Sequence, residues 1–230
     1  MLLCAGGVSA ASRTASWAHD TAVQPERGVE LEQWITDEVE GDDSKIKLWW
    51  GPVVGITDNV EAALPLEITR EQASGQTFLD GYGIDLRFRL VTSDPVLVGP
   101  FVPLLRVSAK RLVQDDAAEL GGSAVLSIDA TKRLHLILEA GMSGVTVGPV
   151  LESQFALAAN YAVLEDVRLG AEAFAEQELD NPDGTRELWI AAGPTVAVTH
   201  GRFWVTLGAP FGLTKAGPRA LPRVVWGIAF

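Results

Sequence analysis

Apolar and polar residues alternate with a period of two along most of this chain, which is the pattern of β-strands with one buried face. The segments 60–68, 82–91, 134–142 and 167–178 show it most clearly, with one face almost purely apolar and the other carrying charges and glycines. No uninterrupted apolar run reaches the roughly 18 residues that a membrane-spanning helix needs. The alternation therefore predicts an all-β fold.

Twelve such segments follow residue 28, and each is about the 9–11 residues that a tilted membrane strand requires. The predicted strands are 29–39, 45–54, 60–68, 82–91, 101–112, 122–130, 134–142, 151–163, 167–178, 187–199, 202–213 and 221–230. Short and long links alternate between them, as expected for an up-and-down barrel with short periplasmic turns and longer external loops. Two links fit less well: 41–44 is short where a long loop is expected, and 92–100 is long where a short turn is expected.

A soluble barrel would place the apolar face inside, whereas a membrane barrel places it outside, and alternation alone does not choose between them. Three features favour lipid outside: both charge signs on neighbouring strands, aromatic residues near strand ends, and a last strand that ends at Phe230. We therefore predict a closed antiparallel up-and-down transmembrane β-barrel of about 12 strands in the outer membrane of a Gram-negative bacterium. A soluble barrel or sandwich is the alternative.

Residues 1–27 are interpreted as a signal-peptide remnant and N-terminal leader, and residues 28–230 as the barrel. Small residues give cleavage options after Ala10 or Ala18, although a basic region before the apolar run is missing. A frayed cytosolic N-terminus is the alternative, and Cys4 is a poor lipoprotein acceptor because little chain precedes it.

The net charge of −12 argues against nucleic-acid binding. A single cysteine excludes a multi-cysteine metal site, and three separated histidines have no metal-ligand spacing. We therefore predict no cofactor and no metal.

The segment Gly51-Pro52-Val53-Val54-Gly55-Ile56-Thr57-Asp58-Asn59-Val60-Glu61 resembles a turn of outer-membrane transporters of the phenol-degradation MetA-pathway type. The likeness in layout extends from about residue 28 to residue 230. It implies a small barrel with a transport role, and it carries no catalytic or binding residues over to this chain.

The charged face supplies the candidate lumen-lining residues. These are Glu61, Glu67, Asp85, Arg87, Arg89, Arg106, Lys110, His135, Glu139, Arg168 and Glu172. Arginines and a lysine on adjacent strands would form a basic ladder that selects small anions or polar solutes. The alternative is a lattice of ion pairs that holds the lumen shut, because buried charges must be paired.

The leading hypothesis is a narrow channel or passive transporter for small polar or anionic solutes. The alternatives are a non-conducting structural or surface barrel and, more weakly, a lipid-modifying enzyme that uses His135 with Glu139 and Ser127. The chain is otherwise predicted not to be an enzyme. Acidic residues in the links are candidate contacts to cations that bridge lipopolysaccharide: Asp42, Asp43, Asp115, Asp116, Glu119, Asp180 and Asp183. Expected partners are outer-membrane lipid, lipopolysaccharide and the assembly machinery that reads Phe230.

Overall fold

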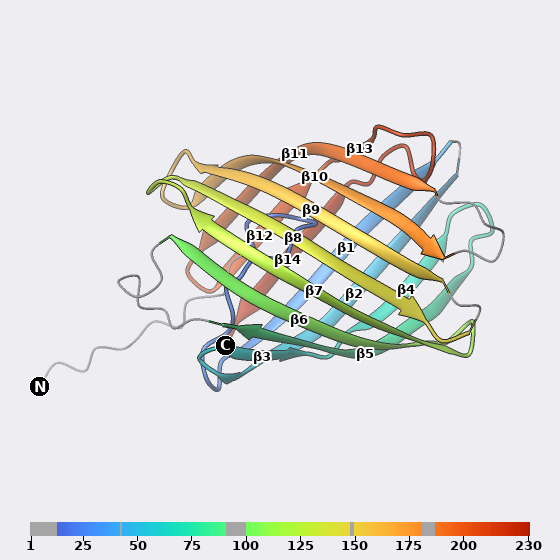
Figure 1. Cartoon of the computed structure of the whole chain (residues 1–230), viewed down its shortest axis with the longest axis horizontal. Helices are drawn as coiled ribbons and strands as arrows, with labels where there is room; N and C mark the ends of the chain where they lie inside the picture. The colour runs from blue at the N-terminus through green and yellow to red at the C-terminus, as the bar shows by residue number, and fades with distance from the viewer. Residues whose placement is uncertain (1–12, 42, 91–99, 148–149, 181–186) are drawn as a thin grey trace, which may run out of the picture.

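The computed structural model describes residues 13–41, 43–90, 100–147, 150–180 and 187–230, and its strands wrap into a barrel (Figure 1). Within these ranges no helix is long and apolar enough to cross a membrane. The strands are β1 (Val29–Glu40), β2 (Asp43–Thr57), β3 (Val60–Ala63), β4 (Leu66–Glu71), β5 (Thr77–Arg89), β6 (Phe101–Leu112), β7 (Ala117–Asp129), β8 (Leu134–Val145), β9 (Leu151–Ala162), β10 (Val167–Asp180), β11 (Leu188–His200), β12 (Phe203–Gly208), β13 (Phe211–Gly212) and β14 (Arg223–Ala229).

Two of the spanning strands are interrupted by proline, which has no N–H to donate to a neighbouring strand. β3 and β4 flank Pro65 and both pair with β2 and β5, while β12 and β13 flank Pro210 and both pair with β11. Each pair of short strands thus acts as one span, which gives twelve spans in the described part of the chain. β1 pairs with both β2 and β14, so the sheet closes on itself. The predicted closed antiparallel barrel of twelve strands is confirmed.

Several strands extend further than the sequence pattern predicts, and they do so at the end of the barrel that carries the long links. β5 begins at Thr77 rather than Tyr82, β7 begins at Ala117 rather than Gly122, and β8 ends at Val145 rather than Met142. Backbone pairing continues here without the apolar alternation, because beyond the bilayer both faces of a strand can meet water. The unexpectedly long link 92–100 lies almost wholly outside the described residues.

The apolar face of the barrel looks outward. Leu138, Leu157 and Leu169 are each more than two-fifths exposed, whereas Arg87 and Glu172, from the opposite face, are buried inside. The aromatic residues expected near the strand ends are also on the outer surface: Phe101, Tyr161, Phe203, Tyr82 and Phe211. Leaving one leucine in water instead of burying it costs about 1.5–3 kcal/mol, so a continuous apolar exterior requires lipid. The predicted orientation of the two faces is confirmed.

The described part of the N-terminal region lies inside the barrel. In Figure 1 the blue coil that precedes β1 lies within the ring of strands, and Arg13 and Gln24 bond side chains of the wall. We call residues 13–27 the plug. Residues 1–27 are predicted from the sequence to be a signal-peptide remnant and leader, with no position relative to the barrel. In the structure residues 13–27 lie against the wall, because the plug carries hydrogen-bond donors that match carboxylates of the wall.

Candidate functional site

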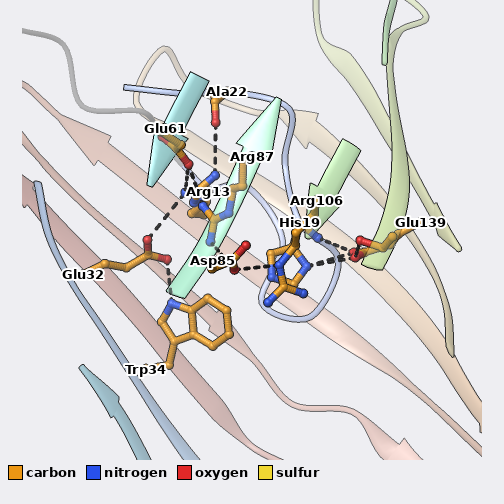
Figure 2. Close-up of polar contacts among 11 residues, drawn as sticks. Arg13, His19, Ala22, Glu32, Trp34, Glu61, Asp85, Arg87, Arg106 and Glu139 are labelled. Atoms are coloured by element: carbon orange, nitrogen blue, oxygen red, sulfur yellow. Dashed lines mark hydrogen bonds and ion pairs between the residues drawn. The ribbon is translucent and has the colours of Figure 1, made fainter. Parts of the chain in front are cut away.

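The plug places one guanidinium among carboxylates of the wall. Arg13 Nη2 lies 3.0 Å from Glu61 Oε1 and 3.5 Å from Glu32 Oε2, and Arg13 Nη1 donates to the carbonyl oxygen of Ala22 at 3.1 Å. Arg87 Nη1 lies on the same Glu61 oxygen at 2.8 Å (Figure 2). Buried charges are tolerated when they are paired, and Glu61 here pairs with two guanidinium groups.

Two other wall glutamates bind the backbone of the plug. Glu172 on β10 accepts hydrogen bonds from the N–H groups of Ser16 at 3.1 Å and Trp17 at 2.9 Å, and from the Ser16 hydroxyl. Glu139 on β8 accepts one from the N–H of His19 at 2.8 Å and lies 3.0 Å from His19 Nδ1. An extended segment without secondary structure thereby satisfies its backbone donors on the wall.

Gln24 repeats this arrangement near the point where the plug leaves the lumen. Its N–H donates to Glu61 Oε2 at 2.7 Å, and its side-chain Nε2 donates to Glu30 Oε2 at 2.7 Å. Glu61 therefore binds the plug at two places, through Arg13 and through Gln24.

Aromatic contacts hold the inner part of the plug. The Trp17 ring stacks on Phe174 with the centroids 4.5 Å apart and an interplanar angle of 17°. The guanidinium carbon of Arg223 lies 3.4 Å from the centroid of the Trp17 ring, and Arg223 Nη1 donates to the carbonyl oxygen of Ser16 at 3.1 Å. Trp17 is thus held between an aromatic ring and a cation, both of which belong to the wall.

Two wall glycines leave space for the plug. A Cβ atom at Gly208 would overlap the Ser16 hydroxyl and lie 2.8 Å from Glu172 Oε1. A Cβ at Gly55 would overlap the carbonyl oxygen of Pro25 and lie 2.7 Å from that of Gln24. Any larger residue at either position would push the plug away from the wall.

The plug fills the lumen at the level of Arg13. Glu30, Glu32, Glu61 and Arg87 have no exposed surface there. Towards the end with the long links, the lumen opens into a cavity of about 570 Å³, which we call the vestibule. Its lining includes Trp17, Trp34, Arg106, Lys110, Glu152 and Glu176.

Three cations of the expected basic ladder, Arg87, Arg106 and Lys110, are each paired with acids. Arg87 contacts Glu61, Arg106 Nε donates to Asp85 Oδ2 at 2.7 Å, and Arg87 Nη2 lies 3.6 Å from the same Asp85 oxygen. These contacts correspond to the alternative that the sequence left open, a lattice of ion pairs.

The candidate cations near the two ends of the barrel differ in their partners. Lys110 Nζ lies 3.0 Å from both Glu67 and Glu119. Arg89 donates to the backbone oxygen of Asp58 at 2.6 Å, within the β2–β3 turn. Arg168 is the second residue of β10, at the short-turn end.

His135 lies between two aspartates, one of them in the plug. Its Nδ1 is 2.8 Å from Asp129 Oδ1 and its Nε2 is 3.4 Å from Asp20 Oδ1, and the Ser127 hydroxyl donates to the same Asp20 oxygen at 3.4 Å. Glu139, the expected acid of a hydrolase, instead binds His19. Among these residues the structure does not assemble the Ser–His–acid relay that the enzyme hypothesis requires.

The acidic residues of the links are only partly described. Asp42 and Asp183 lie outside the described residues, while Asp116 pairs with Arg111 and Glu119 pairs with Lys110. In the ranges that the structure covers, no group of three or more His, Cys, Asp or Glu side chains could hold a metal ion.

No protein-family model matches the sequence, and no curated protein matches it either. Solved structures match in fold. The COG4313 outer membrane channel from Pseudomonas putida F1 has a TM-score of 0.64 at 11% identity, covering 92% of this chain and 98% of that one. The NanC porin has a TM-score of 0.61 at 9% identity, covering 87% and 98%. The KdgM porin in complex with disordered oligogalacturonate has a TM-score of 0.59 at 11% identity, covering 88% and 99%.

At these identities the likeness establishes the fold, which is that of outer-membrane β-barrels. Together with the apolar exterior, this fold places the chain in the outer membrane of a Gram-negative bacterium. Membership of the phenol-degradation transporter family stays a prediction, because no family model matches the sequence.

Proposed function

We propose that this protein is a narrow outer-membrane channel for small polar solutes and that its plug holds it closed. The observation that carries the proposal is the polar vestibule of about 570 Å³, which leads from the long-link end to the plug. Beside an apolar cluster between the plug and the wall, this interior holds charges whose burial must be compensated.

The plug is suited to move because it is not part of the sheet. Its contacts with the wall are side-chain hydrogen bonds, ion pairs, ring stacking and the apolar packing of Ala15, Ala18 and Val23, together with backbone hydrogen bonds near Gly55 at its exit. Each charge-assisted hydrogen bond contributes a net of about 1.5–3 kcal/mol, and water replaces part of it when the plug leaves. The strand ladder that holds the barrel is untouched by that movement.

The structural neighbours support the proposal, since two of them are named porins and the third an outer membrane channel. Their low identity leaves the solute open. The sequence pattern suggested anions, but the paired state of Arg87, Arg106 and Lys110 leaves little free positive charge for them.

Conductance across a planar lipid bilayer tests the proposal. The purified full chain is expected to show rare, small current steps, and a variant lacking residues 13–24 is expected to show larger and more frequent ones. Heat-modifiable migration on a gel verifies that the deletion variant still forms a barrel. Arg27→Gln is the matched control, because Arg27 belongs to the plug segment but its side chain is 90% exposed.

A non-conducting surface barrel is the second candidate, and the filled lumen at Arg13 is the observation in its favour. If neither the full chain nor the folded deletion variant conducts, the channel proposal is wrong and the surface-barrel function takes its place. Contacts with lipopolysaccharide, and recognition of Phe230 by the assembly machinery, are further proposals that fit either function.

A further inference from the structure

The wall around Arg13 carries more negative than positive charge. Glu30, Glu32, Glu61 and Asp85 are buried there, and the wall itself supplies only the guanidinium groups of Arg87 and Arg106 in the contacts described. Arg13 is the third cation, and it belongs to the plug. If the plug leaves, the wall keeps an excess of carboxylate.

Two of these carboxylates also have partners on the wall, which remain when the plug leaves. Glu32 Oε1 accepts a hydrogen bond from Trp34 Nε1 at 2.6 Å, and Glu61 Oε1 is bonded by Arg87 at 2.8 Å. Glu32 Oε2 accepts no hydrogen bond from the described residues and forms an ion pair with Arg13 at 3.5 Å. The site that receives the guanidinium is therefore oriented in advance, which lowers the cost of binding.

Glu30 adds a third carboxylate, whose hydrogen bond of normal geometry comes from the plug. It has no exposed surface, its Oε2 is bonded by Gln24 of the plug, and its Oε1 accepts no hydrogen bond of normal geometry within the described ranges. A buried carboxylate oxygen without a donor is costly, so this group has unused capacity to bind a cation.

We propose that Glu30, Glu32 and Glu61 form a binding site for guanidinium-bearing solutes, such as free arginine or its decarboxylated amine, and that Arg13 occupies this site as a tethered competitor. The inference rests on the proposed channel function and gives it a solute class. A guanidinium fits better than an ammonium because its planar fork offers five donors and is more weakly hydrated. The open channel then selects cations, the opposite of the anion preference that the sequence pattern suggested.

Replacing the tethered guanidinium with a soluble one tests the site directly. In full-length Arg13→Ala, guanidinium chloride at up to about 50 mM, well below denaturing concentrations, is expected to raise the unfolding midpoint of the heat-modifiable band saturably. Sodium chloride at the same ionic strength and neutral urea are expected to give no saturable rise. The wild type and Arg27→Gln are expected not to respond, because Arg13 still fills the site.

Glu32→Gln, added to Arg13→Ala, identifies the carboxylates involved. It leaves the Glu61–Arg87 pair in place, so the wall is expected to fold, and it removes one charged partner of the guanidinium. We expect the half-saturating guanidinium concentration to rise at least about tenfold, as the loss of one buried charged partner implies. Unchanged half-saturation in this variant would overturn the assignment of Glu32.

The site and the channel can fail separately. Equal responses of Arg13→Ala to guanidinium and sodium would overturn the site, as would a reversal potential that shows anion preference in a conducting Arg13→Ala channel. A saturable guanidinium response in a protein that never conducts would uphold the site and refute the channel. The half-saturating concentrations of agmatine and arginine, compared with that of lysine, then measure the preference of the site for guanidinium over ammonium.

Discussion

Replacing Trp17 with alanine should release the plug from the lumen. The substitution removes the stacking on Phe174 at 4.5 Å and the contact with the Arg223 guanidinium at 3.4 Å. Aromatic pairs contribute about 0.5–1.5 kcal/mol, and a desolvated cation–π contact contributes about 2 kcal/mol. With part of the indole burial added, the docked state loses about 3–5 kcal/mol, which shifts the ratio of docked to released plug by about 150-fold to 4,000-fold.

Trypsin cleavage measures this shift without requiring conductance. The bond after Arg13 is protected while the Arg13 side chain is buried in the lumen, whereas the exposed Arg27 serves as an internal reference. When release and return are fast relative to cleavage, the cleavage rate follows the population of the released state. Trp17→Ala should therefore be cut after Arg13 much faster than the wild type, with Trp17→Phe in between, because phenylalanine retains a ring against Phe174.

Equal cleavage rates after Arg13 in Trp17→Ala and in the wild type would refute this reasoning, provided that both proteins migrate as folded barrels. Such a result would mean that the hydrogen bonds to Glu61, Glu139 and Glu172 hold the plug without help from Trp17.

Three further predictions concern the space for the plug, the lipid face and the start of the mature chain. Gly208→Ala should speed cleavage after Arg13, because the added Cβ overlaps the Ser16 hydroxyl, while Gly122→Ala, whose nearest contact is an ordinary 3.5 Å, should not. Leu157→Arg, on the outer face, should lower the free energy of unfolding in lipid vesicles by about 2–4 kcal/mol, measured by denaturant titration against Leu157→Val. N-terminal sequencing should find that the mature chain begins at Ala11, which keeps Arg13 and Trp17 in the protein. Cleavage after Ala18 would remove both residues, so a mature chain that starts at His19 would count against the plug.

The spanning strands were predictable because one local rule governs them. In β5 and β8 most inward residues are polar or small and most outward residues are apolar, since lipid on one side and polar groups on the other leave little freedom. Ile137 of β8 is an inward exception, because it packs against the plug residues Ala15, Ala18 and Val23. The interruptions at Pro65 and Pro210 did not disturb that rule, because the alternation resumes with the same face outward on both sides. Strand ends beyond the bilayer escaped prediction, because no apolar face is required there.

The plug escaped prediction because it has no periodicity of its own. Arg13 meets Glu61, and Ser16 meets Glu172, across 48 and 156 residues of chain, so no local pattern reveals either contact. The glycines offered one usable signal: Gly55 and Gly208 sit on the inward face where a side chain would ordinarily fill space. Inward glycine in a narrow barrel indicates that some other segment approaches the wall closely.

The plug also bridges the two strands whose pairing completes the ring. Arg13 contacts Glu32 on β1, while the Ser16 carbonyl accepts from Arg223 on β14, which in turn donates to Thr36 of β1 across 187 residues of chain. Bringing such distant segments together is the slowest entropic step of a barrel's formation. Residues 13–27 precede β1 directly and bind β14, so they can hold the C-terminal strand beside β1 while the last strand pair forms. A barrel without them is expected to close more slowly, even where the folded barrel is equally stable.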